Sequence, residues 1–199
     1  MLKLVPNILT FGRLVLTILF LGMLLYIPQA NDRIFTFDAA LTIFIIAGLT
    51  DIIDGPIARK LNVASKLGRM LDPLADKILV CGAFICFALI REPALFAISE
   101  TYMNVIRWGI AVILIGRESY VTILRHTAEA KGIDFRAVAS GKIKMFLQSL
   151  TIGIVIVKSA YFPTATWASW FTTITFLVML TATISSGFSA TRRTAPKPA

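Results

Sequence analysis

Four aspartates, Asp51, Asp54, Asp72 and Asp76, lie close together in a sequence that is otherwise strongly apolar. A charged side chain near the middle of a bilayer costs about 2.5 to 3.5 kcal/mol on insertion scales, so four unpaired carboxylates would cost roughly 10 kcal/mol. Hard divalent cations, which prefer oxygen ligands, offset that cost most simply. The cluster therefore predicts a metal-dependent functional site.

The spacing of the acids predicts two helix faces that meet at one site. With about 3.6 residues per turn, Asp51 and Asp54 share one helix face, and Asp72 and Asp76 share a face of the next helix. Carboxylates that face one another repel unless cations lie between them. Two metal ions about 3.5 to 4 Å apart would suit phosphoryl transfer, and all four aspartates are candidate ligands.

The residues between the acids favour a phosphate-bearing organic ligand over a bare ion. Gly55 and Ala58 have minimal side chains, which lets a flat ligand approach the helix backbone. Arg59 has a planar guanidinium that can hold a phosphate through two hydrogen bonds. Gly68 is expected in the turn between the two helices, either as a simple turn residue or as a contact surface for a base ring.

A structural alternative treats the aspartates as helix-end charges and caps. Capping suits Asp72, which precedes Pro73 as an N-cap precedes the first helical residue. It does not account for the whole pattern, because carboxylates buried in membrane spans are rare and usually functional.

The composition is that of a membrane protein. Of the 199 residues, 57% are hydrophobic and 16% are charged, and the mean hydropathy is +0.79. No polar linker separates the hydrophobic segments, so we expect one domain over residues 1–190 and a short basic tail at 191–199. The net charge of +9 is explained by Lys and Arg in cytoplasmic loops, where these residues set topology and attract anionic lipids. Nucleic acid is therefore not expected as a partner.

Six apolar stretches approach the roughly 20 residues that a membrane-spanning helix needs. They run over residues 8–27, 37–58, 72–90, 103–124, 143–162 and 167–188. The sequence thus predicts an all-α protein with six spans and both termini on one side. Basic residues gather at both ends, including Arg13, and after the second and fourth spans, which places the termini in the cytoplasm.

The aspartate motif resembles the signature of the CDP-alcohol phosphotransferase family. The pattern D-x2-D-G-x2-A-R-x8-G-x3-D-x3-D is filled without a gap by Asp51, Asp54, Gly55, Ala58, Arg59, Gly68, Asp72 and Asp76. At a residue usage near one in twenty, such a match arises by chance on the order of once in 10^10 starting positions. The resemblance implies a six-helix membrane enzyme, usually a homodimer, with the motif at the cytoplasmic ends of the second and third helices.

The resemblance implies a CDP-linked lipid as donor, and the rest of the chain must indicate the acceptor. Segments at 6–13, 116–118, 125, 141–144 and 148 resemble those of bacterial members that use glycerol 3-phosphate. A dianionic phosphate needs cations, and an acceptor clamp of four is predicted from Arg117, Arg125, Lys142 and Lys144. The alternative, loop charges that set topology, fits Arg117 least because it interrupts an apolar run. Lys142 and Lys144 are two residues apart, so both reach one ligand only if a side chain bends.

By resemblance, CDP-diacylglycerol binds through two divalent ions, Mg²⁺ with Mn²⁺ as a substitute. Asp51, Asp54 and Asp72 are expected to hold the ions. Asp76 is expected to share one ion and to act as general base on the sn-1 hydroxyl of glycerol 3-phosphate, although metal coordination alone could activate that hydroxyl. Residues 51, 55, 58, 59 and 68 are expected to contact the CDP moiety. The enzyme is expected in the bacterial inner membrane with its site facing the cytoplasm.

Two alternatives remain open from the sequence. A related enzyme would use another acceptor, such as inositol phosphate or phosphatidylglycerol. A divalent-cation transporter would also have intramembrane aspartates, but an ion path does not need Gly55, Ala58, Arg59 and Gly68.

Overall fold

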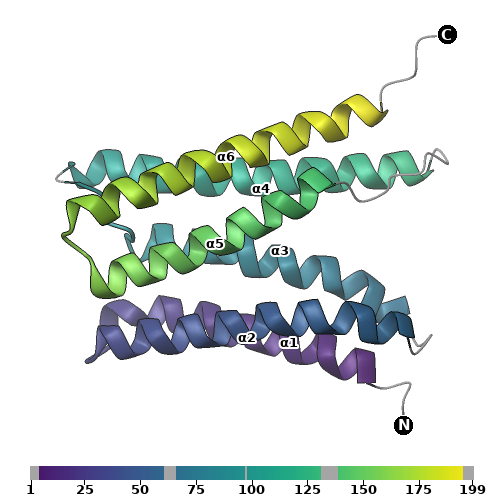
Figure 1. Ribbon diagram of the computed structural model, residues 1–199, viewed down its shortest axis with the longest axis horizontal. Coiled ribbons are helices and arrows are strands. Elements are labelled where there is room, and N and C mark those ends of the chain that lie inside the picture. The colour runs from purple at the N-terminus through teal and green to yellow at the C-terminus, as the bar shows by residue number, and fades with distance from the viewer. Residues whose placement is uncertain (1–4, 61–65, 97, 131–138, 195–199) are drawn as a thin grey trace. The chain divides into compact units, whose positions relative to one another are not determined.

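The computed structural model describes residues 5–60, 66–96, 98–130 and 139–194. Within these ranges it describes the backbone alone for 5–10, 51–73, 129, 139–140 and 193–194. All regular structure in the described residues is helical, which confirms the all-α prediction for them. The helices are α1 (Val5–Tyr26), the short 3-10 helix η2 (Ile27–Gln29), α2 (Arg33–Lys60), α3 (Lys66–Leu89), α4 (Glu100–Ala130), α5 (Ala139–Tyr161) and α6 (Thr166–Thr194) (Figure 1).

Four of the described helices are long and apolar enough to cross a membrane. These candidate spans are Phe11–Gln29, Arg33–Thr50, Gly141–Tyr161 and Thr166–Arg192. The predicted third and fourth spans, in α3 and α4, are not among them. In α4 charged residues interrupt the apolar stretch, namely Glu100, Arg107, Arg117, Glu118 and Arg125. The side chains of the first eight residues of α3 lie outside the described part of the structure, and the rest of that helix is shorter than a span. The chain is therefore a helical membrane protein, and the count of six spans stays a prediction.

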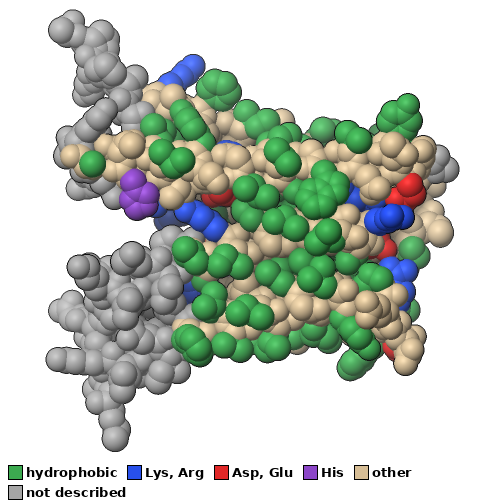
Figure 2. Space-filling view, turned by 180° about the vertical axis from the view of Figure 1, so that it is seen from behind, with side chains coloured by type: hydrophobic (Ala, Val, Ile, Leu, Met, Phe, Trp, Pro, Cys, Tyr) green, Lys and Arg blue, Asp and Glu red, His purple; other side chains and the backbone are tan. Residues whose placement is uncertain are grey.

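The outer surfaces of the helices support a lipid environment. Large apolar side chains such as Phe11, Phe35, Trp167 and Phe188 are exposed. On the face drawn in Figure 2, hydrophobic side chains spread along the helices, whereas most of the visible Lys, Arg, Asp and Glu side chains lie toward the helix ends. An exposed apolar band between polar ends is typical of a protein that contacts lipid tails.

The chain divides into two compact units, Met1–Glu92 with Ser159–Tyr161, and Pro93–Lys158 with Phe162–Ala199. In the first unit α1 packs against both α2 and α3. The rings of Phe20 and Phe44 lie 5.2 Å apart in the contact between α1 and α2. Gly82 lets α3 approach α1 closely, because a Cβ atom there would lie 2.7 Å from Leu21 Cδ1. The single domain over 1–190 stays a prediction.

In the second unit α4 packs against α6, and two buried cations hold the segment that precedes α4. Arg107 donates to the Pro93 carbonyl oxygen through Nε at 3.3 Å and through NH2 at 3.1 Å. Lys158 donates to the carbonyl oxygens of Ala94 and, at 2.9 Å, Pro163. These bonds satisfy loop carbonyls that would otherwise lack partners away from water.

Candidate functional site

The aspartate motif lies at the end of α2 and the start of α3. The backbone is helical in α2 at Asp51, Asp54, Gly55, Ala58 and Arg59, and in α3 at Gly68 and Asp72. The side chains of these seven residues lie outside the described part of the structure. The contacts predicted for them with metal ions and CDP therefore stay predictions.

Helix α3 begins earlier than the sequence predicted. Its first residue is Lys66, so Gly68 lies in the first helical turn, and its expected place in an interhelical turn is wrong. Asp72 lies well inside the helix, which excludes the structural alternative in which Asp72 caps the N-terminus. Pro73 misled that interpretation: its φ is compatible with a helix, and it removes one helical hydrogen bond without ending α3.

Asp76 is the acid of the motif whose side chain the structure describes. Its carboxylate is 27% exposed, and Oδ1 lies 3.5 Å from NH1 of Arg13, whose side chain is 1% exposed. Arg13 comes from α1, the helix that packs against both helices of the motif. A buried guanidinium is costly unless it is paired, so this ion pair fixes α1 and the Asp76 carboxylate relative to one another.

Sequence analysis assigned Arg13 to topology and missed this contact. A signal was present, because Thr17, Phe20 and Leu24 follow Arg13 at helical spacing and all are buried. Arg13 therefore lies on the buried face of an amphipathic stretch. A cation on such a face indicates a buried partner rather than a loop charge.

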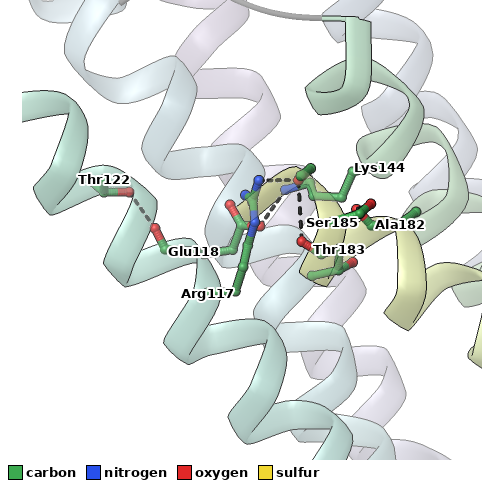
Figure 3. A network of polar contacts seen from close by, with 8 residues as sticks. Arg117, Glu118, Thr122, Lys144, Ala182, Thr183 and Ser185 are labelled. Carbon is green, nitrogen blue, oxygen red and sulfur yellow. Dashed lines mark hydrogen bonds and ion pairs between the residues drawn. The ribbon is translucent and has the colours of Figure 1, made fainter. Parts of the chain in front are cut away.

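A second cluster of ionisable side chains lies inside the other unit (Figure 3). Oε1 of Glu118 accepts a hydrogen bond from NH1 of Arg117 at 2.9 Å and another from Nζ of Lys144. NH2 of Arg117 donates to Oγ of Ser186 on α6. We call Arg117, Glu118 and Lys144 the ion triad. Their side chains are 13%, 13% and 6% exposed, so a net charge of +1 is largely buried between three helices.

The structure brings together two of the four residues of the predicted acceptor clamp. Arg117 and Lys144 share one carboxylate oxygen of Glu118. The side chains of Arg125 and Lys142 are exposed. Lys142 and Lys144 differ in burial because residues two apart point to different sides of a helix. The binding of a ligand by any of these four stays a prediction.

Three buried donor atoms, one on each of α4, α5 and α6, have no hydrogen-bond partner among the described residues. They are Nε of Arg117, Nε2 of Gln148 and Oγ1 of Thr183. Gln148 lies one turn after Lys144 on α5, and Thr183 lies about one turn before Ser186 on α6. Burying a donor without a partner costs about 1–3 kcal/mol. Each of the three helices that contact the ion triad or Ser186 thus carries one buried donor without a described partner.

Sequence analysis missed Thr183 and gave no role to Glu118 or Gln148. The i, i+4 spacing of Lys144 and Gln148 was a usable signal, because two polar residues share one face of a candidate span. Thr183 carried no signal, since threonines recur throughout α6.

Comparison with known proteins relates most of the chain to one family. The family profile described as CDP-alcohol phosphatidyltransferase matches residues 3–180. The chain is 32% identical over 178 residues to the CDP-diacylglycerol–glycerol-3-phosphate 3-phosphatidyltransferase of Bacillus subtilis (strain 168), covering 83% of this chain and 85% of that protein. It is 30% identical over 157 residues to the protein of the same name from Rickettsia typhi, covering 79% and 78%.

A third relative extends well beyond the region that matches this chain. The probable phosphatidylglycerophosphate synthase of Mycobacterium tuberculosis (strain ATCC 25618 / H37Rv) is 32% identical over 150 residues. The match covers 75% of this chain and 64% of that protein, so the chain spans just under two thirds of the mycobacterial relative.

Proposed function

The chain belongs to the CDP-alcohol phosphatidyltransferase family, and from that premise we propose that it transfers the phosphatidyl group of CDP-diacylglycerol to the sn-1 hydroxyl of glycerol 3-phosphate. The products are phosphatidylglycerophosphate and CMP. The names of the Bacillus and Rickettsia relatives support this activity. The observation that carries the choice of acceptor is the buried ion triad, because a net positive charge with unpaired donors suits an alcohol that bears a phosphate.

The donor set of the aspartate motif fits hard divalent ions. Asp51, Asp54, Asp72 and Asp76 offer carboxylate oxygens, and Asp76 is partly exposed, so its carboxylate is within reach of a ligand. These residues would hold two ions, Mg²⁺ with Mn²⁺ as a substitute. When bound, the ions neutralise charge on the pyrophosphate and on the departing CMP.

The chain's own residues bind the substrates and move one proton. Gly55, Ala58 and Gly68 leave room for the CDP moiety, and Arg59 holds its phosphate. Asp76 accepts the proton of the sn-1 hydroxyl as that oxygen forms a bond to the lipid-side phosphorus. The bond from that phosphorus to the CMP oxygen then breaks.

The acceptor is bound through its phosphate. Arg117 and Lys144 carry this role, with Arg125 and Lys142 as further cations of the acceptor clamp. The clamp lowers the free energy of the bound acceptor and limits its orientations.

The enzyme is a multi-pass protein of the bacterial inner membrane in this proposal, with six spans, a cytoplasmic active site and a homodimeric assembly. The distribution of Lys and Arg supports the orientation, and the anionic inner leaflet would attract the same basic residues. Family resemblance supports the dimer.

An acceptor panel tests this proposal. Purified protein is given CDP-diacylglycerol and one acceptor at a time, with or without EDTA, and CMP release is measured. We expect release with glycerol 3-phosphate, little with inositol phosphate or phosphatidylglycerol, and none after EDTA treatment. Activity with inositol phosphate alone would overturn the acceptor, and absence of CMP in every arm would favour the transporter alternative.

A further inference from the structure

Both terminal nitrogens of Arg117 are already used by the protein. NH1 donates to Glu118 at 2.9 Å, and NH2 donates to Ser186 Oγ. The aliphatic stem of the side chain passes beside Gly187, where a Cβ atom would lie 3.6 Å from Arg117 Cγ. The guanidinium is therefore fixed in one plane, and its Nε, which is buried, lacks a partner among the described residues.

Glu118 links this fixed arginine to the second cation. The same oxygen, Oε1, accepts from Arg117 on α4 and from Lys144 on α5, and all three side chains are largely buried. Two buried cations that meet at one oxygen would repel strongly without its negative charge. Glu118 is thus the group that allows Arg117 and Lys144 to be charged and close to one another before any ligand arrives.

Two further buried atoms, on α5 and α6, are hydrogen-bond donors without a partner among the described residues. Nε2 of Gln148 and Oγ1 of Thr183 are buried and lack partners in the described part of the chain, as Arg117 Nε does. Gln148 follows Lys144 along α5, and Thr183 precedes Ser186 along α6, each on the face that supplies a contact to the triad. The triad therefore has donors around it that an oxygen-rich anion can fill.

We infer that Glu118 is a positioning residue of the acceptor-phosphate site: it holds Arg117 and Lys144 in place so that the phosphate of the acceptor meets a preformed set of donors. The inference rests on the proposed function, because it takes glycerol 3-phosphate as the ligand. Glu118 itself does not contact the phosphate. Its contribution is preorganisation, which lowers the cost of ordering two long side chains when the ligand binds.

Removing the Glu118 charge has two opposite effects on phosphate binding. The net charge of the cluster rises from +1 to +2, which attracts an anion more strongly at long range. At contact distance, however, the two cations repel and separate, and Lys144 can extend its long chain toward water. The ligand must then bring the cations together again, so the apparent affinity falls. We expect this second effect to dominate because the site is buried and the lost hydrogen bonds are charge-assisted.

The experiment compares Glu118→Gln, Glu118→Asp and the wild type in steady-state kinetics with purified protein. Glu118→Gln should raise the KM for glycerol 3-phosphate about 10- to 100-fold, the loss expected for charge-assisted hydrogen bonds. The kcat and the KM for CDP-diacylglycerol should change by less than about 2-fold. Glu118→Asp keeps the charge but shortens the side chain, so its KM for the acceptor should lie between the other two.

A matched control exists at the other end of the same helix. Glu100 also pairs with an arginine of α4, since its Oε2 lies 3.1 Å from NH1 of Arg107. Glu100→Gln removes the same charge from a partly exposed carboxylate. It should leave both KM values unchanged.

Three results would overturn the inference. An unchanged acceptor KM in Glu118→Gln would exclude a positioning role, and a lower KM would show that Glu118 competes with the phosphate. The melting temperature in detergent shows whether Glu118→Gln folds. If it does not fold, Glu118→Asp is the deciding variant. An unchanged KM for glycerol 3-phosphate in Glu118→Asp then contradicts the inference. Failure of the proposed function is distinguishable, because the wild type would then release no CMP with glycerol 3-phosphate.

Discussion

The ion pair between Arg13 and Asp76 can orient the carboxylate that is proposed as the general base. The 3.5 Å contact comes from a fully buried guanidinium on a neighbouring helix, so the direction of the Asp76 carboxylate depends on α1 as well as on α3. A general base must be aimed at the proton that it accepts. The pair therefore connects the packing of the first unit to the chemistry proposed for the aspartate motif.

Replacing Asp76 tests its assignment as general base. We expect Asp76→Asn to lower kcat by at least about 100-fold, the lower end of what a positioned base contributes. Binding of CDP-diacylglycerol, measured by titration of the purified variant, should largely survive. Equal loss of turnover and of donor binding would instead make Asp76 a metal ligand only.

Replacing Arg13 tests whether it acts through Asp76. Arg13→Lys keeps the charge but loses the planar fork, so kcat should fall about 3- to 30-fold while the KM for glycerol 3-phosphate is unchanged. In an Asp76→Asn background the same change should cause little further loss, because the two residues then act as one unit. Independent, multiplicative losses in the double variant would contradict the positioning role.

At the scale of whole helices, close packing of α1 against α3 positions that pair. Gly82 allows the approach, since a Cβ atom there would lie 2.7 Å from Leu21 Cδ1. Gly82→Leu should therefore push the two helices apart and cost about 1–3 kcal/mol of stability, as other overpacked contacts do. We expect a lower melting temperature in detergent together with a reduced kcat. Gly109→Leu is the matched control, because the position of its added Cβ atom is open.

The helices themselves were predictable from hydrophobic runs, whereas several boundaries and contacts were not. The start of α3 at Lys66 was missed because Pro73 resembles an N-terminal signal although it lies inside the helix. The contacts of Glu118 depend on how α4, α5 and α6 pack. The sequence around Glu118 does not reveal that its partner is Lys144, 26 positions away. Sequence identified the chemical groups, and tertiary packing decided which of them meet.

At the scale of the whole molecule, the open question is how many helices cross the bilayer. Four described helices meet the length and hydropathy criteria for spans. Charged residues interrupt α4, and the side chains of the first eight residues of α3 lie outside the described part of the structure. Four or six spans both put the termini on one side, so the orientation of the termini does not distinguish them. The location of the segment before α4 distinguishes four spans from six, because this segment lies outside the cytoplasm only if α3 and α4 both cross the membrane.

Cysteine accessibility can decide between these topologies. We expect Ser99→Cys, in a chain whose Cys81 and Cys86 are replaced by alanine, to react with a membrane-impermeant maleimide added to intact spheroplasts. Ser99 is exposed and precedes the first residue of α4, so the reagent can reach it without entering the bilayer. Thr127→Cys, exposed near the other end of α4, is the matched control and should react only after the membrane is permeabilised. A Ser99→Cys variant protected in spheroplasts but labelled after permeabilisation would show that α3 and α4 do not span, and the charges on those two helices would then lie outside the hydrocarbon region.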